Sequence, residues 1–92
     1  MDEKAAIEIM SALAQPTRMA VFVTLAKHQP DGLAVGELAK LVDTPPNTMS
    51  THLSILGRAG AVVAKRTGRV VTYSVAPETI HELAGFLIQQ LG

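Results

Sequence analysis

The stretch that decides the fold runs from residue 35 to residue 60 and reads VGELAKLVDTPPNTMSTHLSILGRAG. It predicts two helices, a short one over 35–42 and a longer one that begins at Pro45 or Pro46 and ends near residue 59. Proline suits the first turn of a helix, where its missing N–H leaves nothing unpaired. Gly60 stands where the residue after a helix commonly adopts a left-handed conformation. A few residues separate the two helices, which is the spacing of a helix-turn-helix.

The residues after this pair change from helical to strand-like periodicity. Two Val-rich runs, 61–65 and 70–75, flank the turn Arg66-Thr67-Gly68-Arg69 and predict a β-hairpin. A hairpin directly after a helix-turn-helix forms a wing. The remaining elements are predicted as helices over 3–14, 16–28 and 77–91, with a short strand at 33–35.

The predicted fold class is mainly α with a small β-hairpin: a winged helix-turn-helix in the order α-α-α-α-β-β-α, over a single domain of residues 1–92. The helix at 16–28 is apolar nearly all round, so we expect it to be the buried central helix. The helix at 35–42 is expected to turn Leu38, Ala39, Leu41 and Val42 inward.

Composition narrows the class of protein. The chain has 92 residues, 48% of them hydrophobic and 17% charged, which excludes a disordered chain and allows one core. No apolar run approaches the ~18 residues of a membrane span, and the acidic N-terminus lacks the order of a secretory signal. We therefore expect a cytoplasmic protein without a membrane partner. With no cysteine, disulfides, thiolate metal sites and a cysteine nucleophile are excluded.

The zero net charge conceals an asymmetry along the chain. Residues 43–76 hold four basic residues and one acidic residue, a net charge of +3, and the rest of the chain carries −3. A basic segment on an otherwise acidic domain favours a local surface for a polyanion. The alternative is ordinary scatter of surface charge.

The second helix of the pair carries the candidate recognition surface. On a helical wheel, Met49, Leu53 and Leu56 share the core side. The opposite side is polar and has no charged residue from 46 to 56; its members are Asn47, Thr51, Ser54 and Arg58, flanked by Thr48 and Ser50. Short polar groups of this kind fit a major groove, where they reach base edges and phosphates. The alternative is a solvated helix face, although such faces are usually rich in Glu and Lys. His52 lies beside the core side, as a half-buried packing residue or a phosphate contact.

The hairpin supplies the second candidate surface. Lys65, Arg66 and Arg69 surround its tip, and a phosphate backbone or a minor groove would provide the anion that three clustered cations need. Edge protection against strand pairing is a compatible alternative. Tyr73 alternates with two valines and is expected to pack inward.

Catalysis and metal binding find little support in the sequence. His52 shares one helix with Ser50 and Ser54, with no nearby acid to orient its imidazole, so we expect no enzyme, no catalytic residue and no cofactor. No pair of histidines has metal-ligand spacing. His81, with Glu78 or Glu82, is the only alternative metal site, across a dimer.

The last helix is more apolar than one small domain requires. Together with the N-terminal helix it could form a symmetric pairing surface, and Gly85 would allow close approach of another helix. The candidate dimer residues are Ile7, Met10, Leu83, Leu87 and Leu91. The alternative is that both helices only cover the domain's own core.

The motifs together resemble one family over residues from about 5 to 91. The ArsR-type (arsenic-repressor-like) winged-helix regulators have second and third helices similar to Ala14-Gln15-Pro16-Thr17-Arg18-Met19 and Val35-Gly36-Glu37-Leu38-Ala39. Their recognition helix is similar to Asn47-Thr48-Met49-Ser50-Thr51-His52-Leu53 with Leu56, and their wing to Arg66-Thr67-Gly68-Arg69 followed by Tyr73.

The resemblance implies a homodimeric transcriptional repressor that binds a roughly palindromic double-stranded operator and leaves it when an inducer, unknown from the sequence, binds. It implies recognition by Thr48, Ser50, Thr51 and His52 and wing contacts by Arg66 and Arg69, with Arg18 either structural or near a phosphate. The chain departs from the family's metal sensors because it lacks their cysteines. Either another ligand is sensed, the protein is constitutive, or sensing cysteines have been cut off or replaced. Two alternatives stay open: a winged-helix module that binds protein, and a metal-responsive repressor using His81 and carboxylates.

Overall fold

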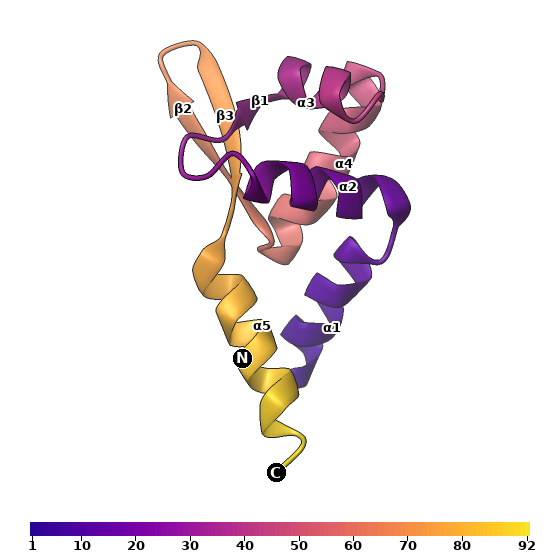
Figure 1. The fold of residues 1–92 in the computed structure, drawn as a ribbon, viewed down its shortest axis with the longest axis vertical. Coiled ribbons are helices and arrows are strands. Elements are labelled where there is room, and N and C mark those ends of the chain that lie inside the picture. The colour runs from indigo at the N-terminus through magenta and orange to yellow at the C-terminus, as the bar shows by residue number, and fades with distance from the viewer.

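The computed structural model describes residues 1–92 and contains five helices and a three-stranded sheet (Figure 1). The predicted order of a winged helix-turn-helix is confirmed, and so is the short strand expected at 33–35, which is one residue shorter. The elements are α1 (Glu3–Leu13), α2 (Pro16–Ala26), β1 (Leu33–Ala34), α3 (Val35–Leu41), α4 (Pro46–Ala59), β2 (Val62–Thr67), β3 (Val70–Val75) and α5 (Pro77–Gln89).

Side-chain caps set the boundaries of the first two helices. Asp2 Oδ1 accepts a hydrogen bond from the Ala5 amide at 2.8 Å, and Gln15 Oε1 accepts one from the Arg18 amide at 2.7 Å. Both bonds satisfy N–H groups that have no partner within the helix. No single helix is long and apolar enough to cross a membrane; α1 and α2 reach that length only together, and they meet at 96°.

The two helices of the helix-turn-helix end in the same way. After α3, the Thr44 amide donates to the Ala39 carbonyl at 2.9 Å, and Asp43 takes a left-handed φ of 51°. After α4, the Ala61 amide donates to the Leu56 carbonyl at 3.0 Å, and Gly60 has a φ of 89°. Both are Schellman motifs, in which a left-handed residue lets the next amide reach back to a free carbonyl.

The sheet has the order β1-β3-β2 and is antiparallel throughout. The hairpin pairs as far as Thr67 with Val70, so its turn is only Gly68 and Arg69. The predicted four-residue turn was too long because both strands continue toward the tip, where a two-residue loop with a positive φ matches their twist. Gly32, with φ +76°, precedes β1, and a Cβ there would collide with the Tyr73 carbonyl oxygen.

The core lies between α4, the neighbouring helices and the base of the hairpin. Its largest fully buried side chains are Ile9, Val21, Leu25, Leu38, Met49, Leu53 and Leu56. The expectation that α2 is the buried central helix is wrong, because only Val21 and Leu25 are buried and Met19 and Val23 are each 43% exposed. Leu41, expected to point inward from α3, is 58% exposed. A small domain has no further layer to cover the outer side of these helices.

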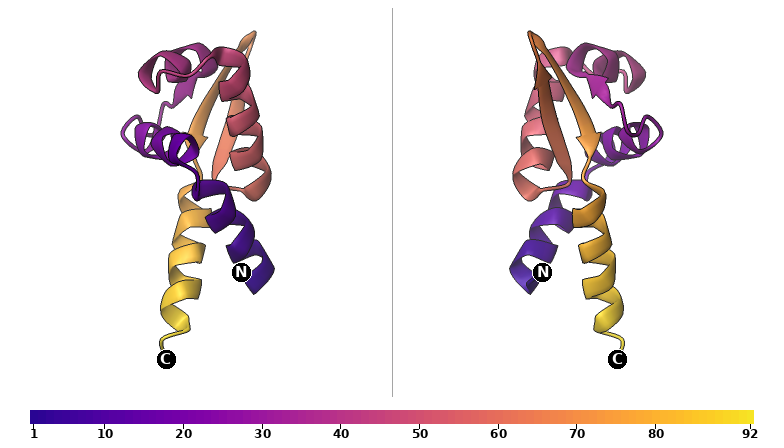
Figure 2. Two further views of the ribbon diagram at one scale, coloured as in Figure 1. Left: turned by 90° about the vertical axis from the view of Figure 1, so that its right-hand side faces the viewer. Right: turned by 90° about the vertical axis from the view of Figure 1, so that its left-hand side faces the viewer.

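Helices α1 and α5 project from one end of the molecule, and the hairpin tip lies at the other (Figure 2). The molecule measures 45 × 25 × 20 Å. It exposes 5876 Å², whereas a compact monomer of 9.7 kDa exposes about 5,100 Å². The chain therefore leaves more surface open than a self-contained domain of its size.

Candidate nucleic-acid interface

The polar side of α4 is open to solvent along its whole length. Met49, Leu53 and Leu56 are buried, as the wheel predicted. The side chains on the opposite side are all exposed: Asn47, Thr48, Ser50, Thr51, Ser54 and Arg58. The interior therefore takes up none of these polar groups.

Hydrogen bonds within the helix order three of these side chains. Ser50 Oγ donates to the Pro46 carbonyl at 3.1 Å, and Thr51 Oγ1 donates to the Asn47 carbonyl at 3.4 Å. Asn47 Oδ1 accepts from the Thr48 amide at 3.0 Å. With its one proton used inside the helix, each hydroxyl presents acceptor lone pairs to the outside.

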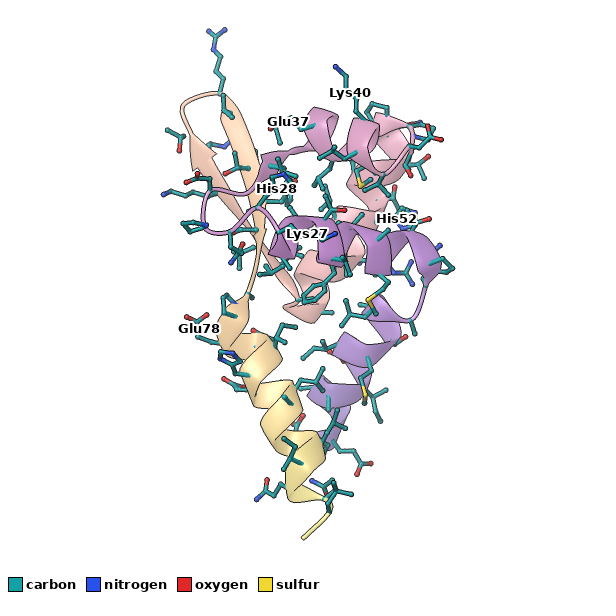
Figure 3. All side chains as sticks on the ribbon, viewed as in Figure 1. Lys27, His28, Glu37, Lys40, His52 and Glu78 are labelled. Atoms are coloured by element: carbon teal, nitrogen blue, oxygen red, sulfur yellow. The ribbon has the colours of Figure 1, made fainter.

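By its spacing from the buried Met49 and the exposed Thr51, His52 lies between the core side and the polar side of α4; Figure 3 labels its side chain. Its ring is half-buried, and its Nδ1 is buried without a hydrogen-bond partner. The expected half-buried position is confirmed. Only the remainder of the ring can reach an external group.

The hairpin carries its cations on both faces. Lys65 pairs with Thr72 and the adjacent Arg66 pairs with Val71, so their side chains point to opposite faces of the ribbon. Both are exposed, as is Arg69 in the turn. Tyr73 is half-buried and packs against the core, so its predicted inward direction is confirmed.

The start of the polar side and the basic tip face the same end of the molecule. The α3–α4 turn and the hairpin tip both lie at the end opposite α1 and α5 (Figure 1), and α4 runs from there to contact β2. A shallow groove of about 440 Å³ opens beside the α3–α4 turn and is lined by Lys40, Asp43 and Pro46 among others. Reasoning from the sequence did not single out Lys40, because one exposed lysine on a short helix has no distinctive local pattern.

Arg18 and Arg58 line a second, larger groove between α1, α2 and α4. Its volume is about 510 Å³. Arg18 donates from Nε to the Ala12 carbonyl, which gives it a structural role at the α1–α2 junction. Arg58 Nη2 donates to Ser54 Oγ at 3.3 Å. This groove was missed because its lining comes from three separate elements.

The projecting helices expose apolar side chains. On α1, Ile7 is 54% exposed, and Met10 is exposed as well. On α5, Leu87 and Ile88 are exposed, and so is Leu91 just after the helix ends. Leu83 needs correction as a candidate dimer residue, because it is 8% exposed and belongs to the chain's own core. The later turns of α5 extend away from the core (Figure 2).

The alternative metal site gains no ligands from the fold. No group of three or more His, Asp or Glu side chains gathers anywhere in the chain, and His81 is exposed on α5.

Comparisons of the sequence identify relatives over most of this chain. The helix-turn-helix domain family matches residues 13–63. The HTH-type transcriptional repressor SmtB of Mycobacterium tuberculosis is 38% identical over 91% of this chain and 58% of its own length. The HTH-type transcriptional regulator CmtR of Mycobacterium bovis is 37% identical over 97% of this chain and 73% of its own length. The chain thus spans somewhat more than half of SmtB.

Solved structures share the whole arrangement. A crystal structure of an ArsR family transcriptional regulator superposes with a TM-score of 0.81 and 28% identity, over 99% of this chain and 91% of that one. The homodimeric winged helix-turn-helix DNA-binding domain of a possible ArsR-family regulator from Mycobacterium bovis has a TM-score of 0.76 and 25% identity, over 96% and 78%. The chain belongs to the ArsR-type family of winged helix-turn-helix transcriptional regulators.

Proposed function

We propose that this chain is a cytoplasmic, homodimeric DNA-binding transcriptional repressor. The observation that carries the proposal is the exposed polar side of α4, which has no charged residue from 46 to 56, on a helix that begins at the same end of the molecule as the basic hairpin tip. Short hydroxyl and amide groups suit base edges in the major groove, and the arginines and lysine of the tip suit the phosphate backbone or the minor groove. The relatives' names, a repressor and a regulator, support the same function.

Each part of this surface has a proposed role. Thr48, Ser50, Thr51 and Ser54 lie along the middle of α4 and read base edges, with Asn47 at its first turn. Lys65, Arg66 and Arg69 neutralise phosphates, and Lys40 does so beside the α3–α4 turn. His52 adds a backbone contact through its outer edge, and Arg58 a contact at the far end of α4.

The dimer is proposed to form through α1 and α5, with residues 1–92 acting as one DNA-binding unit. Two observations support this: the exposed apolar side chains on both helices, and the surface in excess of that of a compact monomer. Ile7, Met10, Leu87 and Leu91 form the contact, together with Ile88. Pairing at this end leaves both copies of α4 free and sets two half-sites about 34–36 Å apart on a palindromic operator.

A fluorescence anisotropy titration with random genomic duplex fragments at low salt tests the proposal. The wild-type protein is expected to bind, and the double variant Arg66→Gln, Arg69→Gln is expected to bind all sequences more weakly. Its log–log salt dependence should be smaller by about one unit per lost phosphate contact. Lys27→Gln, an exposed lysine outside the surface, is the matched control. No binding at micromolar protein would contradict the proposal and favour a module that binds protein.

A further inference from the structure

The groove between α1, α2 and α4 has the lining and the volume of a small-molecule site. Its lining is divided between apolar side chains, such as Ile7, Ile55 and Ala59, and the polar groups of Ser11, Arg18 and Arg58. Its volume of about 510 Å³ lies within the roughly 300–1,000 Å³ of small-molecule sites, which combine an apolar wall with a few polar groups.

The two arginines bring positive charge to this groove from α2 and α4. The guanidinium of the half-buried Arg18 is held by its Nε on the Ala12 carbonyl. Arg58 is held against Ser54. Neither guanidinium donates to a carboxylate, and each keeps N–H groups free in a fork that matches a carboxylate.

We propose that this groove binds an organic anion, a carboxylate with an apolar chain of medium length. The carboxylate lies between Arg18 and Arg58, and the chain covers Ile7 and Ile55. A bare phosphate would use the charge but leave the apolar half of the lining unoccupied. Glu8 is the one acidic residue in the lining, and it weakens binding by repelling the ligand.

The place of the groove links such a ligand to DNA binding. Ile7 belongs to the proposed dimer contact, and Arg58 belongs to α4, so one molecule touches both parts. An anion that engages Arg58 removes a positive charge from the DNA side and thereby lowers DNA affinity; by linkage, DNA lowers the anion's affinity by the same factor. This consequence for DNA rests on the proposed function, whereas binding of the anion does not.

Octanoate is the probe, followed through the backbone amide shifts of the protein by heteronuclear NMR without DNA. We expect saturable shifts around Ser11, Ala12 and Ala59, with a dissociation constant on the order of 1 mM. Acetate, which lacks the chain, and 1-octanol, which lacks the charge, should bind about tenfold more weakly or worse. Sedimentation in the same samples records the oligomeric state.

Three single variants separate the proposal from its rivals. Arg58→Gln should weaken octanoate about tenfold, Glu8→Gln should tighten it, and Lys27→Gln, with the same loss of charge as Arg58→Gln, should leave it unchanged. The proposal is wrong if octanoate causes no saturable amide shift in the groove. That is the result expected if side chains of the partner fill the groove in the dimer. Equal binding by Arg58→Gln and Lys27→Gln also overturns the proposal. If Arg58→Gln instead lowers only DNA affinity and its salt slope, the groove is a phosphate contact and the proposal is wrong.

Measuring DNA affinity with and without octanoate distinguishes failure of this inference from failure of the proposed function. Octanoate should lower DNA affinity of the wild type and of Lys27→Gln, and have little effect on Arg58→Gln. Octanoate binding in a protein that fails to bind DNA would support the groove and contradict the repressor. Normal DNA binding that octanoate leaves unchanged at saturation would contradict the proposed linkage.

Discussion

The Thr44 amide donates to the Ala39 carbonyl at 2.9 Å, and this bond closes the turn between the two helices of the helix-turn-helix. It requires a left-handed residue at Asp43, and the two prolines that follow lead directly into α4. The direction of α4 relative to α3 is therefore set by this backbone conformation together with the packing of Leu38 against the buried side of α4.

Replacing Asp43 tests how much this conformation costs. With φ at 51°, a residue with a Cβ is disfavoured by about 1 kcal/mol relative to glycine. We expect Asp43→Gly to have a free energy of unfolding about 1 kcal/mol higher than Asp43→Ala, measured by chemical denaturation at one protein concentration. Equal stabilities would show that the turn tolerates a different conformation.

Gly32 is a position where the fold excludes a side chain. A Cβ would collide with the Tyr73 carbonyl oxygen, and φ is +76°. Gly32→Ala should lose about 2–4 kcal/mol of stability, because the β1–β3 pairing must shift. Gly36→Ala is the control: this glycine in the first turn of α3 has open space around it, so the variant should lose no stability. Similar losses in both variants would contradict the structure around Gly32.

The proposed dimer contact makes Leu87 a sensitive position. Leu87→Glu is expected to shift the protein to monomer in analytical ultracentrifugation, because a charge would be buried at the contact without a partner. Its melting temperature should lose the concentration dependence of a dimer. Leu41→Glu introduces the same change at an exposed leucine of α3 and should remain dimeric. A Leu87→Glu protein that stays dimeric would place the contact elsewhere.

Thr51 and Lys40 should affect DNA binding in different ways. The Thr51 hydroxyl uses its proton within α4 and offers lone pairs, so it suits the amino groups of adenine or cytosine in the major groove. Thr51→Ala should change base preference at one operator position in a selection from random duplexes. By contrast, Lys40→Gln should lower the affinity for DNA of every sequence and reduce the log–log slope of affinity against salt by about one. The same preference profile in Thr51→Ala and wild type would contradict the reading role of Thr51.

Local patterns made α4 predictable. Met49, Leu53 and Leu56 recur at helical spacing, and Pro46 and Gly60 mark the two ends, so both the element and its exposed side follow from nearby residues. The wing followed from its valines and glycine, although the length of its turn depended on how far the strands pair.

Burial that depends on distant elements could not be predicted in the same way. Leu41 and Leu83 occupy apolar positions on their helices, yet one is exposed and the other buried, because only the tertiary arrangement decides which side another element covers. The groove of Arg18 and Arg58 is a stronger case, since its residues come from three helices and share no sequence pattern.

The absence of charge from residues 46–56 of α4 has a consequence for how a target would be found. Under the proposed function, the cations of the wing hold any duplex, and the neutral side chains of α4 add affinity only where the bases fit. Such a protein can diffuse along DNA of unrelated sequence, because α4 does not hold it there. Higher ionic strength would then shorten the distance that the protein diffuses along DNA before it dissociates. It would leave the preferred sequence unchanged.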